Sequence, residues 1–310
     1  MYQRMLVPLD GSELAEVVFP YAKELAGRLD LDVILLHAST PAEHEFIPMH
    51  QAYIERAAEI VRRQAREVQE STGIQPESKP VEVRGELTEG YPEEEVLRYA
   101  DENAVDFIIM ATHGRSGRKR WTMGNVAGKV MHEAKTPVLL VRAGIPDEIP
   151  YGKWPSKTIL VPLDGSEMAE SVLPHVEALA KQRGTEPVNV VLLRVSETPT
   201  IPSYYGSELS GVSLDWGEFI PQETARRKQV ATDYLTGVEK RLKDSNISVR
   251  SEVREGKAAD ELVDYANKNP LSLIIMATHG RSGLSRLVYG SVAANLLQGV
   301  SNPIFLVKPQ

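Results

Sequence analysis

Two copies of one glycine-containing stretch contain the residue types of an anion-binding loop. The letters MATHGRSG occupy residues 110–117 and again residues 276–283. Gly114 and Gly280 allow positive φ and let the backbone approach a ligand closely. After nine further residues, Gly124 and Gly290 stand at the start of a predicted helix. Unpaired N–H groups and the helix dipole favour a negative charge there, so the pattern predicts a phosphate-bearing ligand.

A second repeated stretch, VPLDGSE at residues 7–13 and 161–167, contains an aspartate that could contact the same ligand. Asp10 and Asp164 either cap a helix and shape a turn or contact a ligand, and both readings fit Asp-Gly-Ser chemistry. Dipole stabilisation of an anion contributes only about 0.3–2 kcal/mol. Micromolar affinity needs roughly 8 kcal/mol. An apolar slot for a base must therefore contribute to binding.

These stretches belong to a tandem repeat. The offset between the copies is 154 residues at VPLDGSE, 157 at the second strand and 166 at MATHGRSG. We expect domains at residues 1–143 and 157–310, joined by a proline-containing linker at 144–156. The copies are predicted to differ chiefly in one connection, residues 198–221. Its aromatic residues suggest either a packed or mobile loop, or a lid or partner surface; they are Tyr204, Tyr205, Trp216 and Phe219.

Apolar runs alternate with amphipathic stretches in each copy. In the first copy we predict strands near residues 5–8, 33–37, 81–86, 107–111 and 138–142, and helices near 13–28, 51–71, 92–102 and 125–134. Pro20 and Pro174 fall inside the first helix of their copies, where we expect a kink. Strict alternation predicts an α/β fold with a parallel five-stranded sheet in each domain, helices on both faces and strand order 3-2-1-4-5.

That strand order makes the two repeated stretches meet. Strands 1 and 4 are then neighbours whose following helices leave to opposite faces, which opens a crevice beyond the strand ends. The LDGSE and ATHGRSG loops would face each other across this crevice. Ala38 and Val195, near the end of the second strand, would border it.

The spacing resembles that of the universal stress proteins, whose pattern is V-P-x-D-G-S and then G-x2-G-x9-G-[S/T]. The second copy has Gly280, Gly290 and Ser291 in this pattern, whereas the first has Asn125 after Gly124. Ala111 and Ala277 stand where the family pattern has its first glycine. The resemblance covers nearly the whole chain. It implies a Rossmann-like fold related to the adenine nucleotide alpha hydrolases, with ATP or related nucleotides in one branch and no nucleotide in the other.

By this resemblance, Asp10 and Asp164 contact the adenosine end, and His113 and His279 lie beside the nucleotide. Gly280, Gly290 and Ser291 are expected to bind phosphates, with Mg²⁺ as a possible companion ion. We predict no catalytic residue and no protein metal site. The predicted ligand-binding residues are Pro8, Asp10, Ala38, His113, Gly114, Gly124 and Asn125 in the first copy and Pro162, Leu163, Asp164, Val195, Met276, Ala277, His279, Gly280, Arg281, Gly283, Gly290, Ser291 and Val292 in the second.

The expected function is ATP binding for sensing or regulation in stress responses, with the second copy as the better site. Two alternatives stay open: a scaffold that acts through protein partners, and a slow ATPase. The basic residues of the first loop either form a solvated face or steer phosphates; they are Arg115, Arg118, Lys119 and Arg120. The chain has neither a P-loop nor a dinucleotide G-x-G-x-x-G motif.

Composition narrows the setting and the partners. The net charge of −8 argues against non-specific nucleic-acid binding, which needs a basic face. The absence of cysteine fits a reducing compartment. With no apolar run of bilayer length, we expect a cytoplasmic protein without a membrane partner. The apolar fifth strands, residues 138–142 and 304–308, would lie at sheet edges. Because such edges invite pairing, we predict that they meet antiparallel in an intramolecular pseudo-dimer, and that a homodimer is possible.

Overall fold

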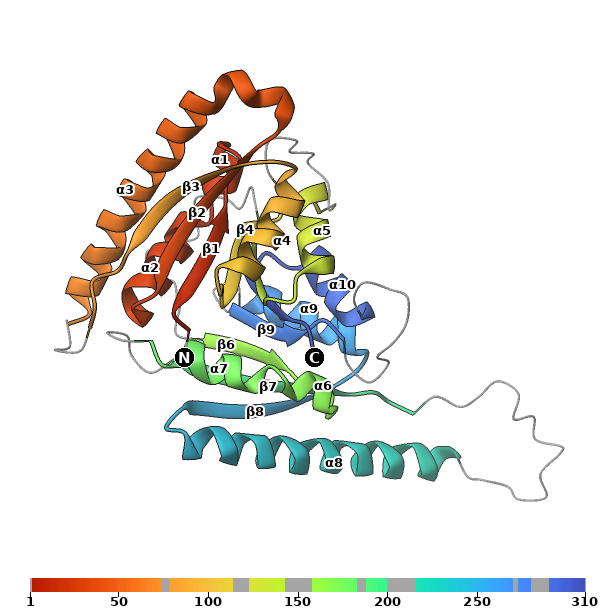
Figure 1. Ribbon diagram of the computed structural model, residues 1–310. Helices are drawn as coiled ribbons and strands as arrows, with labels where there is room; N and C mark the ends of the chain where they lie inside the picture. The colour runs from red at the N-terminus through yellow and green to blue at the C-terminus, as the bar shows by residue number, and fades with distance from the viewer. Residues whose placement is uncertain are drawn as a thin grey trace.

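The chain folds around one continuous ten-stranded sheet with helices on both faces (Figure 1). The computed structural model describes residues 2–73, 78–113, 123–142, 158–182, 188–199, 216–269, 273–279 and 290–309. The strand order is β3-β2-β1-β4-β5-β10-β9-β6-β7-β8. Equivalent strands of the two domains therefore follow in the same order from either edge of the sheet. Strands within each half are parallel, and the halves join through antiparallel β5 and β10. The predicted α/β class with two repeated domains is confirmed.

The first domain contains β1 (Arg4–Pro8), α1 (Glu13–Glu16), α2 (Phe19–Leu29), β2 (Asp32–Ser39), the 3₁₀ helix η1 (Pro41–Phe46), α3 (Ile47–Ser71), β3 (Val83–Glu89), α4 (Pro92–Glu102), β4 (Phe107–Ala111), α5 (Asn125–Glu133) and β5 (Val138–Val141). The second contains β6 (Thr158–Pro162), α6 (Glu167–Glu170), α7 (Leu173–Ala180), β7 (Asn189–Ser196), α8 (Trp216–Asp244), β8 (Ser248–Glu255), α9 (Ala258–Lys268), β9 (Leu273–Ala277), α10 (Ser291–Gly299) and β10 (Ile304–Val307).

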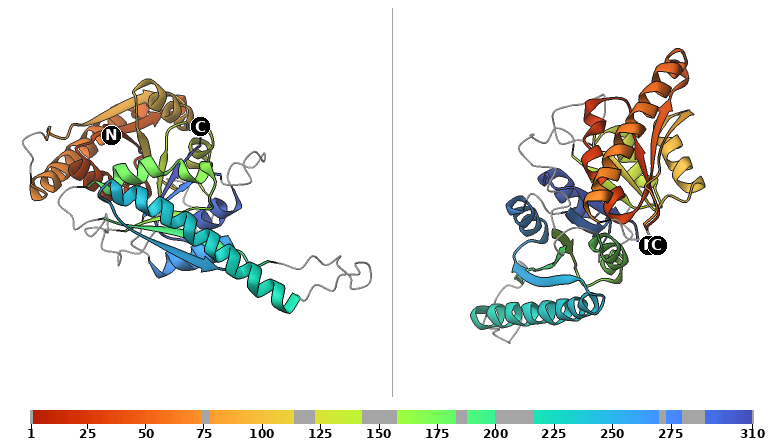
Figure 2. Two further views of the ribbon diagram at one scale, coloured as in Figure 1. Left: turned by 90° about the horizontal axis from the view of Figure 1, so that it is seen from below. Right: turned by 90° about the vertical axis from the view of Figure 1, so that its left-hand side faces the viewer.

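The sheet separates two layers of apolar packing. Alternate residues of β1 divide between them: Met5 and Val7 join the layer under α2 and α3, and Leu6 joins the layer under α4 and α5. The second domain repeats this division, with α7 and α8 on one face and α9 and α10 on the other (Figure 2). The central strands β4 and β9 are buried along their whole length, which explains their uninterrupted apolar sequences.

The first helix of each domain is broken rather than kinked, so the prediction of one helix over residues 13–28 is wrong. In the first domain α1 ends at Glu16 and α2 begins at Phe19, with Pro20 in its first turn. Pro174 occupies the same place in α7. Proline lacks the N–H that an interior helical position must donate, but first-turn N–H groups have no intrahelical acceptor. The chain therefore restarts the helix at each proline.

The two copies differ in two connections, which corrects the prediction that they differ chiefly in one. The buried stripe of α3 matches that of α8 at an offset of 177 residues; the stripes are Ile54, Ala58, Val61 and Ala65 against Ala231, Leu235, Val238 and Leu242. The offset is 157 at the preceding strand and 166 at the following one. The connection before α8 is thus 20 residues longer than its counterpart, and the one after it is 11 residues shorter.

The predicted loop at residues 198–221 is also partly helical, because α8 begins at Trp216 and includes Pro221. The first turns of α8 extend beyond the sheet (Figure 1). Tyr204 and Tyr205 lie outside the described residues, as do residues 143–157, which cover the predicted linker.

The domains are joined by a shared sheet and by ring contacts among Tyr2 and Phe107 of the first domain and His175 and Phe305 of the second. Ile304 pairs with Leu140 and Phe305 with Leu139, which confirms the predicted antiparallel contact of the fifth strands. Each domain also donates a basic side chain to the last turn of the other domain's final helix. Arg142 Nη1 donates to the Val300 carbonyl at 2.6 Å, and Lys308 Nζ donates to the His132 carbonyl at 3.1 Å. Cations at helix C-termini complement both the dipole and the unpaired carbonyls.

Within the described parts of the chain, no helix combines the length and the apolar character that crossing a bilayer would require.

Candidate functional site

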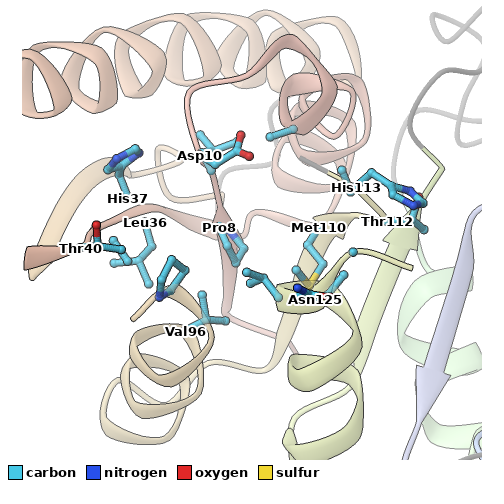
Figure 3. A pocket seen from close by; sticks show the side chains of 18 of the residues that line it. Pro8, Asp10, Leu36, His37, Thr40, Val96, Met110, Thr112, His113 and Asn125 are labelled. Carbon is cyan, nitrogen blue, oxygen red and sulfur yellow. The ribbon is translucent and has the colours of Figure 1, made fainter. Parts of the chain in front are cut away.

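Each domain has one cleft at the carboxyl ends of its central strands. The first cleft has a volume of about 370 Å³ and the second about 700 Å³. Both lie within the range of about 300–1,000 Å³ that is usual for small-molecule sites. In the first cleft, Asp10 from the turn after β1 and Asn125 from the start of α5 border the same space (Figure 3). The second cleft brings Asp164 and Ser291 together in the same way.

The turn after the first strand is built by its aspartate and capped by its serine. Asp10 Oδ1 accepts hydrogen bonds from the backbone N (3.0 Å) and the Oγ (2.6 Å) of Ser12. Ser12 Oγ in turn accepts from the N–H of Ala15 at 3.2 Å and is the N-cap of α1. Gly11 has φ of 78°, a conformation that glycine adopts without strain.

The second domain repeats this turn closely. Asp164 Oδ1 accepts from the backbone N (2.9 Å) and Oγ (2.6 Å) of Ser166, which caps α6 through the Ala169 N–H at 3.1 Å. The aspartates therefore shape the turn, as one sequence alternative held, but the residue that caps the helix is the serine. Both aspartates also line their clefts.

The start of the last helix is positioned by a backbone bond that the sequence did not reveal. Gly124 N–H donates to the Thr112 carbonyl, and Gly290 N–H donates to the Thr278 carbonyl, each at 2.9 Å. The expectation that these two glycine amides are unpaired is therefore wrong. The amides available for an anion are those of the first turn of α5 and α10, which begin at Asn125 and Ser291.

The backbone conformation at position 290 does not require glycine. Its φ of −62° and ψ of 156° suit any residue. A Cβ at this position would meet the Thr278 carbonyl oxygen at 3.6 Å, an ordinary contact. Local geometry alone therefore does not explain why glycine occupies this position. Because glycine has no side chain, it leaves the space in front of the helix terminus open. At Gly124 the same Cβ would be tighter, 3.3 Å from the Thr112 carbonyl oxygen.

The two loop histidines are anchored by the preceding threonines. His113 Nδ1 lies 3.2 Å from Thr112 Oγ1, and His279 Nδ1 lies 3.1 Å from Thr278 Oγ1. Burial, and then the charge of Arg142, lower the pKa of His113. His113 is accordingly neutral near pH 7, so it can border a ligand as a polar wall but adds no positive charge for a phosphate.

All described residues of the predicted site line the clefts. In the first cleft these are Pro8, Asp10, Ala38, His113, Gly124 and Asn125. In the second they are Pro162, Leu163, Asp164, Val195, Met276, Ala277, His279, Gly290, Ser291 and Val292. Gly114, Gly280, Arg281 and Gly283 lie outside the described residues, as does the basic loop of the first copy.

Sequence reasoning missed several lining residues. Val96 of α4 forms an apolar wall of the first cleft, and Leu262 of α9 forms the equivalent wall of the second. Helical spacing of apolar residues could have indicated that both side chains face inward. The missed residues also include Leu36, Thr112 and Ala127 in the first cleft and Leu193, Arg194, Thr278, Ala293, Arg226 and Arg227 in the second. Arg226 and Arg227 follow the longer connection, so the sequence alone does not show which residues of the first domain they correspond to. The structure shows this through the packing of α8 against the sheet.

The donor set suits a nucleotide better than a bare metal ion. Among the residues that the structure describes, no group of three His, Cys, Asp or Glu could hold a metal. A divalent ion would therefore arrive with the phosphates of a ligand, and the Ser291 hydroxyl at the first position of α10 is a suitable oxygen beside it. The apolar wall and the helix terminus offer what a base and a phosphate need, respectively.

Comparison with known proteins identifies relatives for the whole chain. The sequence profile of the universal stress protein family matches residues 1–142 and 155–308. A universal stress protein of Mycolicibacterium smegmatis is 22% identical over 99% of this chain and 97% of its own length. One from Methanocaldococcus jannaschii is 28% identical over 49% of this chain and 82% of its own length. The crystal structure of a universal stress protein from Archaeoglobus fulgidus shares the fold, with a TM-score of 0.63, 20% identity and 98% coverage of both chains.

Proposed function

Because the chain belongs to the universal stress protein family, with two such domains in tandem, we propose that it binds ATP and serves a sensing or regulatory role in stress responses. The observation that carries this proposal is the convergence of Asp164, Gly290 and Ser291 on one cleft. Asp164 is far from Gly290 and Ser291 in the sequence, and the parallel sheet with its switch point between β6 and β9 brings their loops together.

Each part of the cleft has a role in this proposal. The α10 amides and the Ser291 hydroxyl receive the phosphates, Asp164 accepts hydrogen bonds from the sugar, and the wall containing Leu262 and Met276 receives the base. The helix dipole contributes about 0.3–2 kcal/mol of binding free energy. Micromolar affinity needs roughly 8 kcal/mol, so burial of the base against this wall must supply a large part of the rest.

The second domain is proposed as the better site. Its cleft is larger, about 700 Å³ against about 370 Å³, and serine rather than asparagine opens its last helix. The first cleft has the same turn and the same helix terminus, so we propose that it is a weaker site of the same kind.

The test is calorimetry of the purified full chain with ATP and Mg²⁺, together with analysis of any nucleotide that copurifies. Gly290→Val places a branched side chain at the helix terminus, and we expect it to lose ATP binding while the protein stays folded. Gly237→Val is the matched control, because a Cβ at Gly237 of α8 meets nothing within 4 Å. Absence of binding by the unchanged protein at millimolar ATP would overturn the proposal.

One observation favours a second function, a scaffold that acts through protein partners. Ala111 and Ala277 line the clefts, each only 7% exposed, where the family pattern has glycine. Partner capture that is insensitive to ATP, together with nucleotide-free protein, would support the scaffold instead. If ATP turnover is observed, its persistence in Gly290→Val and Ser291→Ala would assign it to a contaminant.

A further inference from the structure

The register of the two domains reveals a group of arginines in the second cleft that has no counterpart among the described residues lining the first. The offset of 177 residues between α3 and α8 places Arg226 and Arg227 where the first domain has Met49 and His50. The offset of 157 residues between β2 and β7 places Arg194 where it has His37. We call Arg194, Arg226 and Arg227 the arginine cluster. All three line the second cleft.

Arg194 is held in place from two sides. A Cβ on Gly165 would lie 3.0 Å from Arg194 Nη1, so the guanidinium rests on the Asp-Gly-Ser turn itself. On its other side, its guanidinium carbon lies 4.8 Å from the centre of the Tyr234 ring. Planar stacking of this kind fixes the direction of the guanidinium before any ligand arrives. Alanine, Ala57, takes the place of Tyr234 in the first domain.

Arg226 and Arg227 share one carboxylate, that of Glu223. Arg226 donates to it at 2.6 and 2.8 Å and Arg227 at 2.8 Å, and these hydrogen bonds lower the pKa of Glu223 to about 2. Arg227 also donates to the Glu197 carbonyl at 3.2 Å. Glu223 is the carboxylate bonded to both of these guanidinium groups, and Glu197 also lines this side of the cleft. Each guanidinium has five N–H donors, so donors remain for a further acceptor.

The arginine cluster lies across the cleft from the start of α10. Arg194 is near the end of β7 and α10 follows β9, with β6 between these two strands. Two strand spacings amount to about 10 Å. The buried residues of α8 and α10 also belong to opposite layers of the sheet. The cleft thus has one anion-binding feature at each end.

The lining of the second cleft differs from that of the first mainly at the end where the arginine cluster lies. Most residues that line the second cleft have a counterpart in the first, and Glu197 takes the place of Thr40. The residues whose counterparts do not line the first cleft are Ser196, Arg226, Arg227, Val230 and Ala231, and all but Ser196 belong to α8. The larger volume of the second cleft therefore includes the space beside the arginine cluster.

We propose that the second cleft takes an adenine nucleotide with an additional phosphate on its ribose, which the arginine cluster binds while α10 holds the 5′-phosphate. The proposal rests on nucleotide binding as proposed above. Asp164 is the expected partner of the sugar, and Arg194 lies against Gly165, the next residue. A phosphate on a ribose hydroxyl would therefore come beside Arg194. Arginine suits phosphate because its planar fork of donors matches the oxygens.

The test is calorimetry of the full chain with two matched pairs of probes. Adenosine 3′,5′-bisphosphate and AMP differ by one ribose phosphate, and diadenosine tetraphosphate and ATP differ by one adenylyl unit, which is a second adenosine with its phosphate. We expect the bisphosphate to bind about tenfold or more tightly than AMP, the factor of a charge-assisted hydrogen bond. Arg226→Gln/Arg227→Gln should remove this preference, so that the bisphosphate and AMP bind with similar affinity. Lys240→Gln/Lys243→Gln, which likewise removes two positive charges elsewhere on α8, should keep it.

The outcomes separate this proposal from the proposed function. Binding of ATP and AMP without a preference for the bisphosphate, or a preference that survives the double substitution, would overturn the ribose-phosphate site and leave nucleotide binding intact. A preference for diadenosine tetraphosphate alone would assign the arginine cluster to a bridging dinucleotide and overturn it likewise. Failure of every probe to bind would overturn both proposals.

Discussion

Replacing Phe305 by alanine should weaken the contact between the two domains as well as the second domain itself. Phe305 lies on β10 and is fully buried, 0% exposed. Its ring is 5.7 Å from that of Phe107 and 6.4 Å from that of Tyr2, both in the first domain, and 5.9 Å from that of His175 in the second. Truncation of a buried phenylalanine costs about 3–5 kcal/mol of unfolding free energy.

The part that belongs to the interface can be measured separately. An edge-to-face aromatic pair contributes about 0.5–1.5 kcal/mol beyond burial. Urea unfolding followed by circular dichroism, on Phe305→Ala, Phe107→Ala and the double variant, should give a coupling free energy of this size. Phe219→Ala is the control, because Phe219 on α8 is 40% exposed, and we expect a change within about 0.5 kcal/mol.

A coupling energy below about 0.3 kcal/mol would be that of independent sites. It would refute the prediction that these two rings stabilise the contact between the domains. Two separate unfolding transitions, with only one of them moved by Phe305→Ala, would refute it as well.

Three further changes test other contacts. Ser166→Ala removes the N-cap of α6 and should lower the unfolding free energy by about 0.5–2 kcal/mol; an unchanged urea midpoint would contradict the cap. Arg142→Gln removes a part-buried charged donor to the Val300 carbonyl and should cost about 1.5–3 kcal/mol, whereas Lys308→Gln, whose bond is exposed, should cost less than about 1 kcal/mol in the same assay. Burial lowers the pKa of His175 below its ordinary value of about 6.5, so below that pH the unfolded chain binds the proton first and stability should fall on acidification. Unfolding curves between pH 7 and pH 5 should show a shallower loss in His175→Gln, and an equal loss would remove His175 as a cause.

Local sequence signals were sufficient where one physical requirement dominates. The strand predicted at residues 107–111 is β4 with the same bounds, because a strand buried on both faces must be apolar throughout. The final helix was predicted at 125–134 and is Asn125–Glu133. The signal failed at Pro20, where periodicity continues across a point that cannot supply a hydrogen-bond donor.

The start of α8 differs from the predicted loop for another reason. Pro221 and the aromatic residues before it are typical of a loop, yet α8 begins at Trp216. The buried stripe from Ala231 to Leu242 packs the later part of the helix against the sheet, whereas most residues between 217 and 230 are exposed. Propensity is a weak prior, and helix formation is cooperative, so a packed helix can continue into an exposed segment.

The amino-acid sequence by itself determined the tandem repeat, the α/β class, the antiparallel fifth strands and part of the lining of each cleft. These follow from periodicity and from the handedness of parallel crossovers, which leave few alternatives. Only the tertiary structure decided that the amides of Gly124 and Gly290 are already used and that Arg226 and Arg227 line the second cleft. The glycine bonds depend on how closely the chain after the fourth strand approaches the start of the last helix. The arginines depend on the register of α8, which packing against the sheet sets rather than any local run of residues.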